Sequence, residues 1–169
     1  MCIRDRISYN QVGHGTYLRA FAFARELANM GQDVSIMAAS KRTSDFKIRH
    51  ENENGIDIYS FPSIFAGGPR SGWDPYSLLT RVNWVRERDF DLVHGFESRP
   101  TVIYPALVLK KKGVPLLLDW CDWFGAGGSV EERPNKTLRF FFRPLESFYE
   151  NHYRKIPDHT TVICKTLYN

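Results

Sequence analysis

A glycine-containing loop near the start of the chain has the residue types of an anion-binding turn. Residues 9–19 read YNQVGHGTYLR, and Gly13 and Gly15 carry no Cβ, so the backbone there can approach a ligand closely. A helix beginning after this loop would offer unpaired N–H groups and the positive end of its dipole, which together bind phosphate. The loop therefore predicts a phosphorylated or nucleotide-linked ligand contacted by Gly13, His14, Gly15 and Arg19. A tight turn without a ligand is the alternative.

The loop differs from a dinucleotide-binding fingerprint in two places. Leu18 stands where the third glycine belongs, and the second predicted strand runs into Ser40, Lys41 and Arg42 instead of an acidic residue. Both differences disfavour a nicotinamide cofactor, although the basic pair could accept a 2′-phosphate. An NADP-dependent oxidoreductase domain therefore stays open as an alternative.

Two aspartates follow the apolar segment 114–118 and are candidates for catalysis. Asp119 and Asp122 flank a Trp-Cys pair, and a carboxylate at such a strand end can hold sugar hydroxyls or transfer a proton. Asp119 could instead cap the following loop by accepting backbone N–H groups. Trp123 could stack on a sugar face, or belong to the core as aromatic residues near strand ends often do. We predict Asp122 and Asp119 as catalytic residues and Trp123 as a substrate contact.

His94 and Glu97 are further binding candidates, because they lie at and just beyond another apolar segment. His94 either contacts a ligand or is a buried structural histidine. Glu97 either contacts a ligand or pairs with Arg99 across solvent. The five histidines and three cysteines show no metal-ligand spacing, so we predict no metal site.

Hydrophobic periodicity places these residues on alternating strands and helices. Predicted strands cover residues 7–9, 33–38, 56–61, 91–96, 114–119 and 160–164, with a possible edge strand at 46–49. Predicted helices cover 16–29, a segment starting at Asp74-Pro75, 100–112, and 136–155, the last broken or kinked before Pro144. This alternation predicts an α/β fold with a doubly wound, mostly parallel, Rossmann-like sheet flanked by helices. Ligands of such sheets bind beyond the carboxyl ends of the strands, where the glycine loop, His94, Glu97 and both aspartates are expected to meet.

The same periodicity indicates which side chains face the core. They are Leu18, Phe21, Ala24 (or Arg25) and Ala28 in the first helix, Leu78, Leu79, Val82 and Val85 in the second, and Val102, Ala106 and Leu109 in the third.

The first six residues, MCIRDR, place three consecutive charges where a central strand should be apolar. We interpret residues 1–6 as a non-native leader, which leaves 7–9 as the first strand and 7–169 as a single domain.

Composition indicates a globular protein and narrows its partners. The chain has 169 residues, 43% of them hydrophobic, and a net charge of +4. It contains no apolar run of about 20 residues and no signal-peptide pattern, so we predict a cytoplasmic protein. We also predict that it does not bind nucleic acid. The basic and aromatic stretch 136–155 could lie on an anionic membrane surface. A helix with one core face and one solvated face is the preferred interpretation.

Five segments, taken in order, resemble the N-terminal half of a type-B-fold glycosyltransferase of the large retaining family 4. They are GHGTYLR at 13–19, ARELANMGQDV at 24–34, DLVH at 91–94, VPLLLDWCD at 114–122 and DHTTVICK at 158–165. The second resembles the family's A-x-x-L-x-x-x-G-H-x-V run, with Gln32 in place of the usual histidine. The fourth resembles a strand that ends in H-D, with Trp120 and Cys121 intervening here.

The resemblance implies a chain truncated at both ends that forms the acceptor-side domain and lacks the C-terminal donor domain. It implies transfer of a sugar, with retention and without an obligatory metal or cofactor, from a nucleotide-sugar donor to a carbohydrate or lipid-linked acceptor. The glycine loop would contact the donor diphosphate, and Asp122 or Asp119 would orient hydroxyl groups. This half alone would be inactive, and peripheral contact with the inner membrane face is possible. A stand-alone nucleotide- or phosphate-binding module without catalysis is the alternative.

Overall fold

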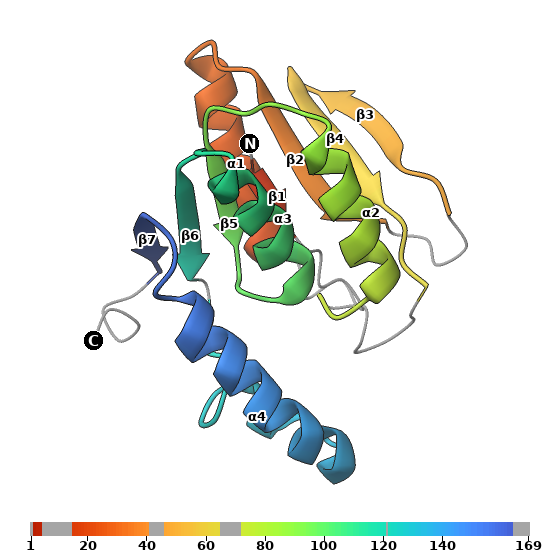
Figure 1. Ribbon diagram of the computed structural model, residues 1–169, viewed down its shortest axis with the longest axis vertical. Helices are drawn as coiled ribbons and strands as arrows, with labels where there is room; N and C mark the ends of the chain where they lie inside the picture. The colour runs from red at the N-terminus through yellow and green to blue at the C-terminus, as the bar shows by residue number, and fades with distance from the viewer. Residues whose placement is uncertain (1, 5–14, 41–45, 65–71, 121, 164–169) are drawn as a thin grey trace.

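The computed structural model describes residues 2–4, 15–40, 46–64, 72–120 and 122–163, which form one sheet covered by helices on both faces (Figure 1). The strands are β1 (Cys2–Arg4), β2 (Val34–Ala39), β3 (Arg49–Glu53), β4 (Ile56–Phe61), β5 (Val93–Phe96), β6 (Leu116–Trp120) and β7 (His159–Val162). The helices are α1 (Gly15–Asn29), α2 (Pro75–Arg86), α3 (Pro100–Lys111), the short 3-10 helix η2 (Ser129–Glu132) and α4 (Lys136–Tyr153).

The strand order confirms the predicted doubly wound, Rossmann-like α/β sheet. Within the described residues the order is β3-β4-β2-β1-β5-β6-β7. Neighbouring strands are parallel except for β3 and β4, which are antiparallel. The chain winds outward from β1 through β2 to β4 on one side and from β5 to β7 on the other. The switch point, where such sheets bind ligands, therefore lies at the carboxyl ends of β1 and β5.

The first strand is the main difference from the predicted elements. β1 covers Cys2–Arg4, and Cys2 pairs with Ile36 of β2 on one side and with His94 of β5 on the other. The central strand thus falls inside residues 1–6, the segment that we interpreted as a leader. The non-native origin of this segment stays a prediction. The strand expected at 7–9 lies outside the described residues.

Two hydrophobic clusters pack against opposite faces of the sheet. α2 and α3 cover one face, where Val102, Ala106 and Leu109 are fully buried as predicted. α1 covers the other face through Ala20 and Ala24, which are also fully buried.

Two predicted core residues are instead exposed. The exposed fraction is 63% for Leu18 and 61% for Leu79. In α1 the neighbouring alanine stripe faces the sheet, and in α2 the buried positions are occupied by Arg81, Trp84 and Val85. Both helices carry apolar residues on two adjacent faces. Periodicity alone therefore assigned Leu18 and Leu79 to the buried face, although each lies on the neighbouring exposed face.

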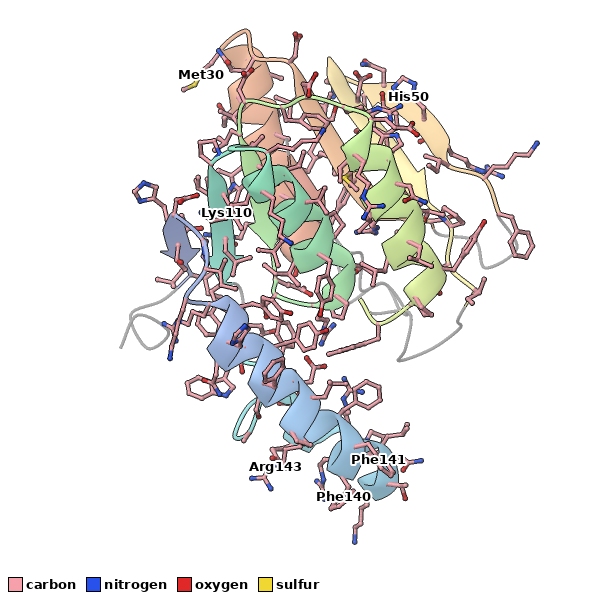
Figure 2. All side chains as sticks on the ribbon, viewed as in Figure 1. Met30, His50, Lys110, Phe140, Phe141 and Arg143 are labelled. Carbon is pink, nitrogen blue, oxygen red and sulfur yellow. The ribbon has the colours of Figure 1, made fainter. Side chains whose placement is uncertain are left out.

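Helix α4 differs from its prediction in two ways. It runs unbroken through Pro144, and its phenylalanines do not form a core face. Phe140 is 74% exposed and Phe141 64% exposed, and Figure 2 shows both near the end of α4 that extends away from the sheet. The buried side chains of α4 are Glu146, Glu150 and Tyr153, so two carboxylates and a tyrosine, rather than Phe140 and Phe141, face the body. In the described part of the chain, no helix has the length and apolar character needed to cross a membrane.

Candidate functional site

Three segments distant in sequence meet at the carboxyl ends of the central strands. The start of α1 contacts the residue that follows β5 through Thr16, whose Oγ1 donates a hydrogen bond to Glu97 Oε1 over 3.1 Å. One turn later, Arg19 contacts Asp119 in β6. The predicted convergence of α1, β5 and β6 is therefore confirmed for the described residues. Gly13 and His14, the first part of the glycine loop, lie outside them.

Arg19 and Asp119 form a two-bond ion pair at this rim. Arg19 Nε lies 2.6 Å from Asp119 Oδ2, and Nη2 lies 2.9 Å from Oδ1. Asp119 is fully buried and also accepts a hydrogen bond from the Thr161 hydroxyl of β7. The side chain of Arg19 remains 32% exposed. Asp119 therefore fixes the position of the guanidinium of a side chain that is partly exposed, and a guanidinium is the cationic group that best matches a phosphate.

The hydrogen bonds described for Asp119 do not decide between a catalytic residue and the loop cap considered above. Its bonds to Arg19 and Thr161 run to side chains of other elements. A fully buried carboxylate with these partners is well placed to position Arg19. Its assignment as a catalytic residue stays a prediction.

Glu97 has an unusual backbone conformation at the same rim. Its φ is +84°, in the left-handed region that residues other than glycine rarely occupy, and its side chain is buried. Such strain is found preferentially at functional sites. Arg99 Nη1 lies 3.8 Å from Glu97 Oε2, so the two predicted partners do lie together, but inside the protein rather than across solvent.

His94 is buried in β5 below this rim. Its ring packs 4.3 Å from the Phe96 ring and 5.5 Å from the Phe23 ring of α1, measured between centroids. Burial lowers the pKa of His94 to about 4, although the nearby Asp119 charge acts in the opposite direction. The imidazole is therefore neutral at pH 7. Among the described residues, its Nε2 has no hydrogen-bond partner.

Asp122 and Trp123 lie on the exposed loop that follows β6. Trp123 is 46% exposed, and its indole Nε1 donates to the carbonyl of Ala126 over 3.0 Å. Asp122 Oδ1 accepts from the Trp123 backbone N–H over 3.2 Å. The Asp122 carboxylate and one part of the indole thus remain open to a ligand. Neither belongs to the Arg19–Asp119 pair.

The structure adds a residue that sequence analysis did not find, Glu150 of α4. Its two carboxylate oxygens accept the backbone N–H groups of Phe124 and Gly125, each over 2.8 Å. Burial raises the pKa of Glu150, while these two bonds act against the rise. A Cβ at Gly125 would lie 2.6 Å from Glu150 Oε2, so the loop needs a glycine there. Glu150 therefore holds the backbone next to Asp122 and Trp123.

A second carboxylate of α4 connects this loop to the rim. Glu146 is buried and accepts from Arg99 over 3.2 Å and from Arg133 over 3.0 Å. The guanidinium of Arg99 also lies 4.3 Å from the centre of the Phe124 ring. Two glutamates four residues apart in an otherwise basic helix are the one sequence signal that could have indicated this connection.

Among the described residues, no three His, Cys, Asp or Glu side chains are grouped as a metal ion would require.

We predict that buried His94 makes the fold sensitive to acid. Its pKa is about 4 in the folded state and 6.5 in the unfolded chain, so the unfolded state binds more protons between these values. Stability therefore rises with pH across this window, and acidification from pH 7 to 4 should remove about 3 kcal/mol of unfolding free energy through His94. Urea unfolding of the protein and of His94→Gln at both pH values measures this. An equal acid-dependent loss in both proteins would contradict the prediction.

The comparison with known protein families agrees with the fold. Residues 13–165 match the family described as glycosyl transferase 4-like domain. A search of curated proteins finds no match to this chain. The family match spans the glycine loop, both faces of the sheet and α4. The chain therefore belongs to the glycosyl transferase 4-like domain family, and its fold is a glycosyltransferase domain.

Proposed function

We propose that this chain is the acceptor-side half of a glycosyltransferase that moves a sugar from a nucleotide-sugar donor to an acceptor with retention. The observation that carries the proposal is the Arg19 guanidinium, which Asp119 holds at the start of α1 beside the strained Glu97. A cation and a helix N-terminus at the switch point of a doubly wound sheet are suited to an anionic ligand. The family match supplies the reaction class.

The chemistry assigned to each group follows from charge. When the acceptor oxygen bonds to the anomeric carbon of the sugar, the bond from that carbon to the diphosphate oxygen breaks and the hydroxyl proton passes to the leaving diphosphate. Negative charge grows on the oxygen that joined the sugar to the diphosphate. Arg19 and the amides of the glycine loop would stabilise that charge by fixed dipoles and a fixed cation. Asp122 would orient the acceptor or sugar hydroxyls, and the Trp123 indole would pack on a sugar face. Neutral His94 offers a hydrogen bond without adding charge. No metal is assigned a role in this proposal.

The other donor contacts would come from a second domain that faces this one. We therefore propose that the chain by itself binds a donor weakly and transfers no sugar, and that the longer protein works in the cytoplasm. A stand-alone nucleotide-binding module would instead bind nucleotide without transfer in any longer protein. An NADP-dependent oxidoreductase would prefer NADPH, through Lys41 and Arg42.

We expect Gly15→Val to weaken nucleotide-sugar binding at least tenfold, because its side chain would block the approach of a diphosphate to the first turn of α1. Isothermal calorimetry with UDP- and GDP-sugars measures the affinity. Ala22→Val, which adds two methyl groups at an exposed position of α1, is the control and should leave affinity unchanged. Unaltered binding by Gly15→Val would remove the loop from the site, and preferential binding of NADPH would favour the oxidoreductase alternative.

For the longer protein that includes the second domain, we expect Asp122→Asn to lower kcat about 100-fold or more while the KM for donor stays unchanged. A glycosyl-transfer assay with varied donor measures both constants. Asp33→Asn is the control, because Asp33 is exposed and precedes β2, at the amino ends of the strands. A kcat loss no greater than that of Asp33→Asn would show that Asp122 does not act in transfer.

We also propose that the outer surface of α4 contacts an anionic membrane, as a lipid-linked acceptor would require. A shallow hollow on α4 gathers Phe140, Phe141, Lys136, Arg139 and Arg143. The acidic residue in this hollow is Glu131, which lies 2.9 Å from Arg143, and the carboxylates of α4 itself are buried. Exposed phenylalanines beside an excess of cations are typical of helices that lie in the membrane interface.

We expect the double variant Phe140→Ser/Phe141→Ser to bind vesicles of phosphatidylglycerol and phosphatidylcholine at least tenfold more weakly than the unmodified chain. Co-sedimentation measures the bound fraction. Phe46→Ser is the matched control, since Phe46 is 67% exposed but precedes β3, far along the chain from α4. Equal binding by the double variant and the control would exclude α4 as the membrane contact.

A further inference from the structure

An apolar groove lies between α2 and α3, on the side of these helices that faces away from the sheet. The two helices run side by side over one face of the sheet (Figure 1). The groove has a volume of about 660 Å³. This volume falls within the range of about 300–1,000 Å³ that is usual for small-molecule sites. None of the residues that form the candidate donor and acceptor sites line it.

The walls of the groove are almost wholly apolar. Leu79 and Val82 of α2 face Leu107 and Val108 of α3 across it, and Ile156 contributes beyond α4. Leu79 is the residue that the sequence placed in the core and that the structure leaves 61% exposed. A leucine that projects into a groove rather than packing inward leaves apolar area available to a ligand.

One end of the groove is cationic. Arg86, Lys110 and Lys111 come from the last turns of α2 and α3, and no carboxylate lines the groove. The charge of Lys110 is compensated by Asp158, because Lys110 Nζ lies 2.5 Å from Asp158 Oδ1. Among the described residues, Arg86 and Lys111 have no carboxylate within ion-pair distance. A ligand here therefore needs an apolar body and one anionic end.

The size of the groove favours a small molecule over a protein partner. Ten residues line it. A stable protein interface uses about 20–30 residues on each side. We propose that the groove binds a free, single-chain anionic amphiphile of the fatty-acid class. Its chain lies between Leu79, Val82 and Leu107, and its head group lies at Arg86 and Lys111.

Calorimetry with dodecanoate below its micelle concentration tests both the apolar chain and the anionic head group of the proposed ligand. Saturable binding is expected, with decanoate about tenfold weaker because two fewer methylenes are buried. Dodecanol, which has the same chain without the charge, should bind at least fivefold more weakly than dodecanoate. Lys111→Gln should weaken the binding of dodecanoate by a similar factor and leave the affinity for dodecanol unchanged. Absence of saturable binding, or equal affinity for the two chain lengths, would overturn the proposal.

Two leucine variants test the location. Leu79→Glu places a carboxylate in the groove and should weaken dodecanoate at least tenfold. Its matched control, Leu138→Glu, makes the same change at a leucine of α4 that is 46% exposed, and should stay within twofold of the unmodified protein. Both positions are exposed, so folding should survive, which circular dichroism verifies. An equal loss in both variants would overturn the location.

Two further binding measurements, with vesicles and with a peptide, distinguish the proposed ligand from a membrane and from a protein partner. Anionic vesicles in place of dodecanoate should bind equally to Leu79→Glu and to the unmodified chain, because a bilayer does not enter the groove. The proposal would be overturned, and the groove assigned to a protein partner, if an acidic amphipathic peptide bound more tightly than dodecanoate and lost that binding in Leu79→Glu. No donor or acceptor is present in these measurements, so their outcome is independent of the glycosyl-transfer proposal.

Discussion

The buried carboxylate of Asp119 is the constraint on which the rim of the sheet depends. It lies at the end of β6 with no exposed surface, where an unpaired charge would be very costly. Arg19 of α1 and Thr161 of β7 meet that requirement, so one carboxylate joins three elements that are far apart in sequence. Loss of one partner from a buried ion pair costs about 3–5 kcal/mol, somewhat less where the partner reaches solvent as Arg19 does. The same bonds fix the position of Arg19, whose side chain is 32% exposed, at the rim of the sheet.

Helix α4 repeats this arrangement with two further buried carboxylates. Glu150 accepts two backbone N–H groups of the loop after Asp122, and Glu146 pairs with Arg99 from the end of β5. Because its carboxylates point inward, the outer surface of α4 is left to phenylalanines and cations. The exposed surface of the helix and the fixed backbone at Phe124 and Gly125 are thus two results of the same orientation.

Sequence patterns were sufficient for the class of sheet and for the meeting of β5 and β6 at its rim, since long apolar runs separated by amphipathic helices admit few topologies. They were not sufficient for β1, because the charged residues 4–6 led us to interpret residues 1–6 as a leader. They failed where two faces of a helix were similarly apolar, as at Leu18 and Leu79, because tertiary packing decides between them. They also could not find Glu150, whose partners lie 25 and 26 residues earlier and are backbone groups without a side-chain signature. The positive φ of Glu97 is likewise a tertiary effect that no local pattern encodes.

The alanine face of α1 has a geometric consequence. Ala20 and Ala24 are fully buried and pack against the larger side chains of the sheet, such as Ile36 and Phe96, so the helix contributes only methyl groups at these two positions. These residues work as a thin spacer whose thickness sets how deeply the first turn of α1 sits beside β5. Any larger residue there would lift the helix as a rigid rod and carry Thr16 and Arg19 with it. The position of Thr16 and Arg19 at the rim therefore depends on two of the smallest side chains in the domain.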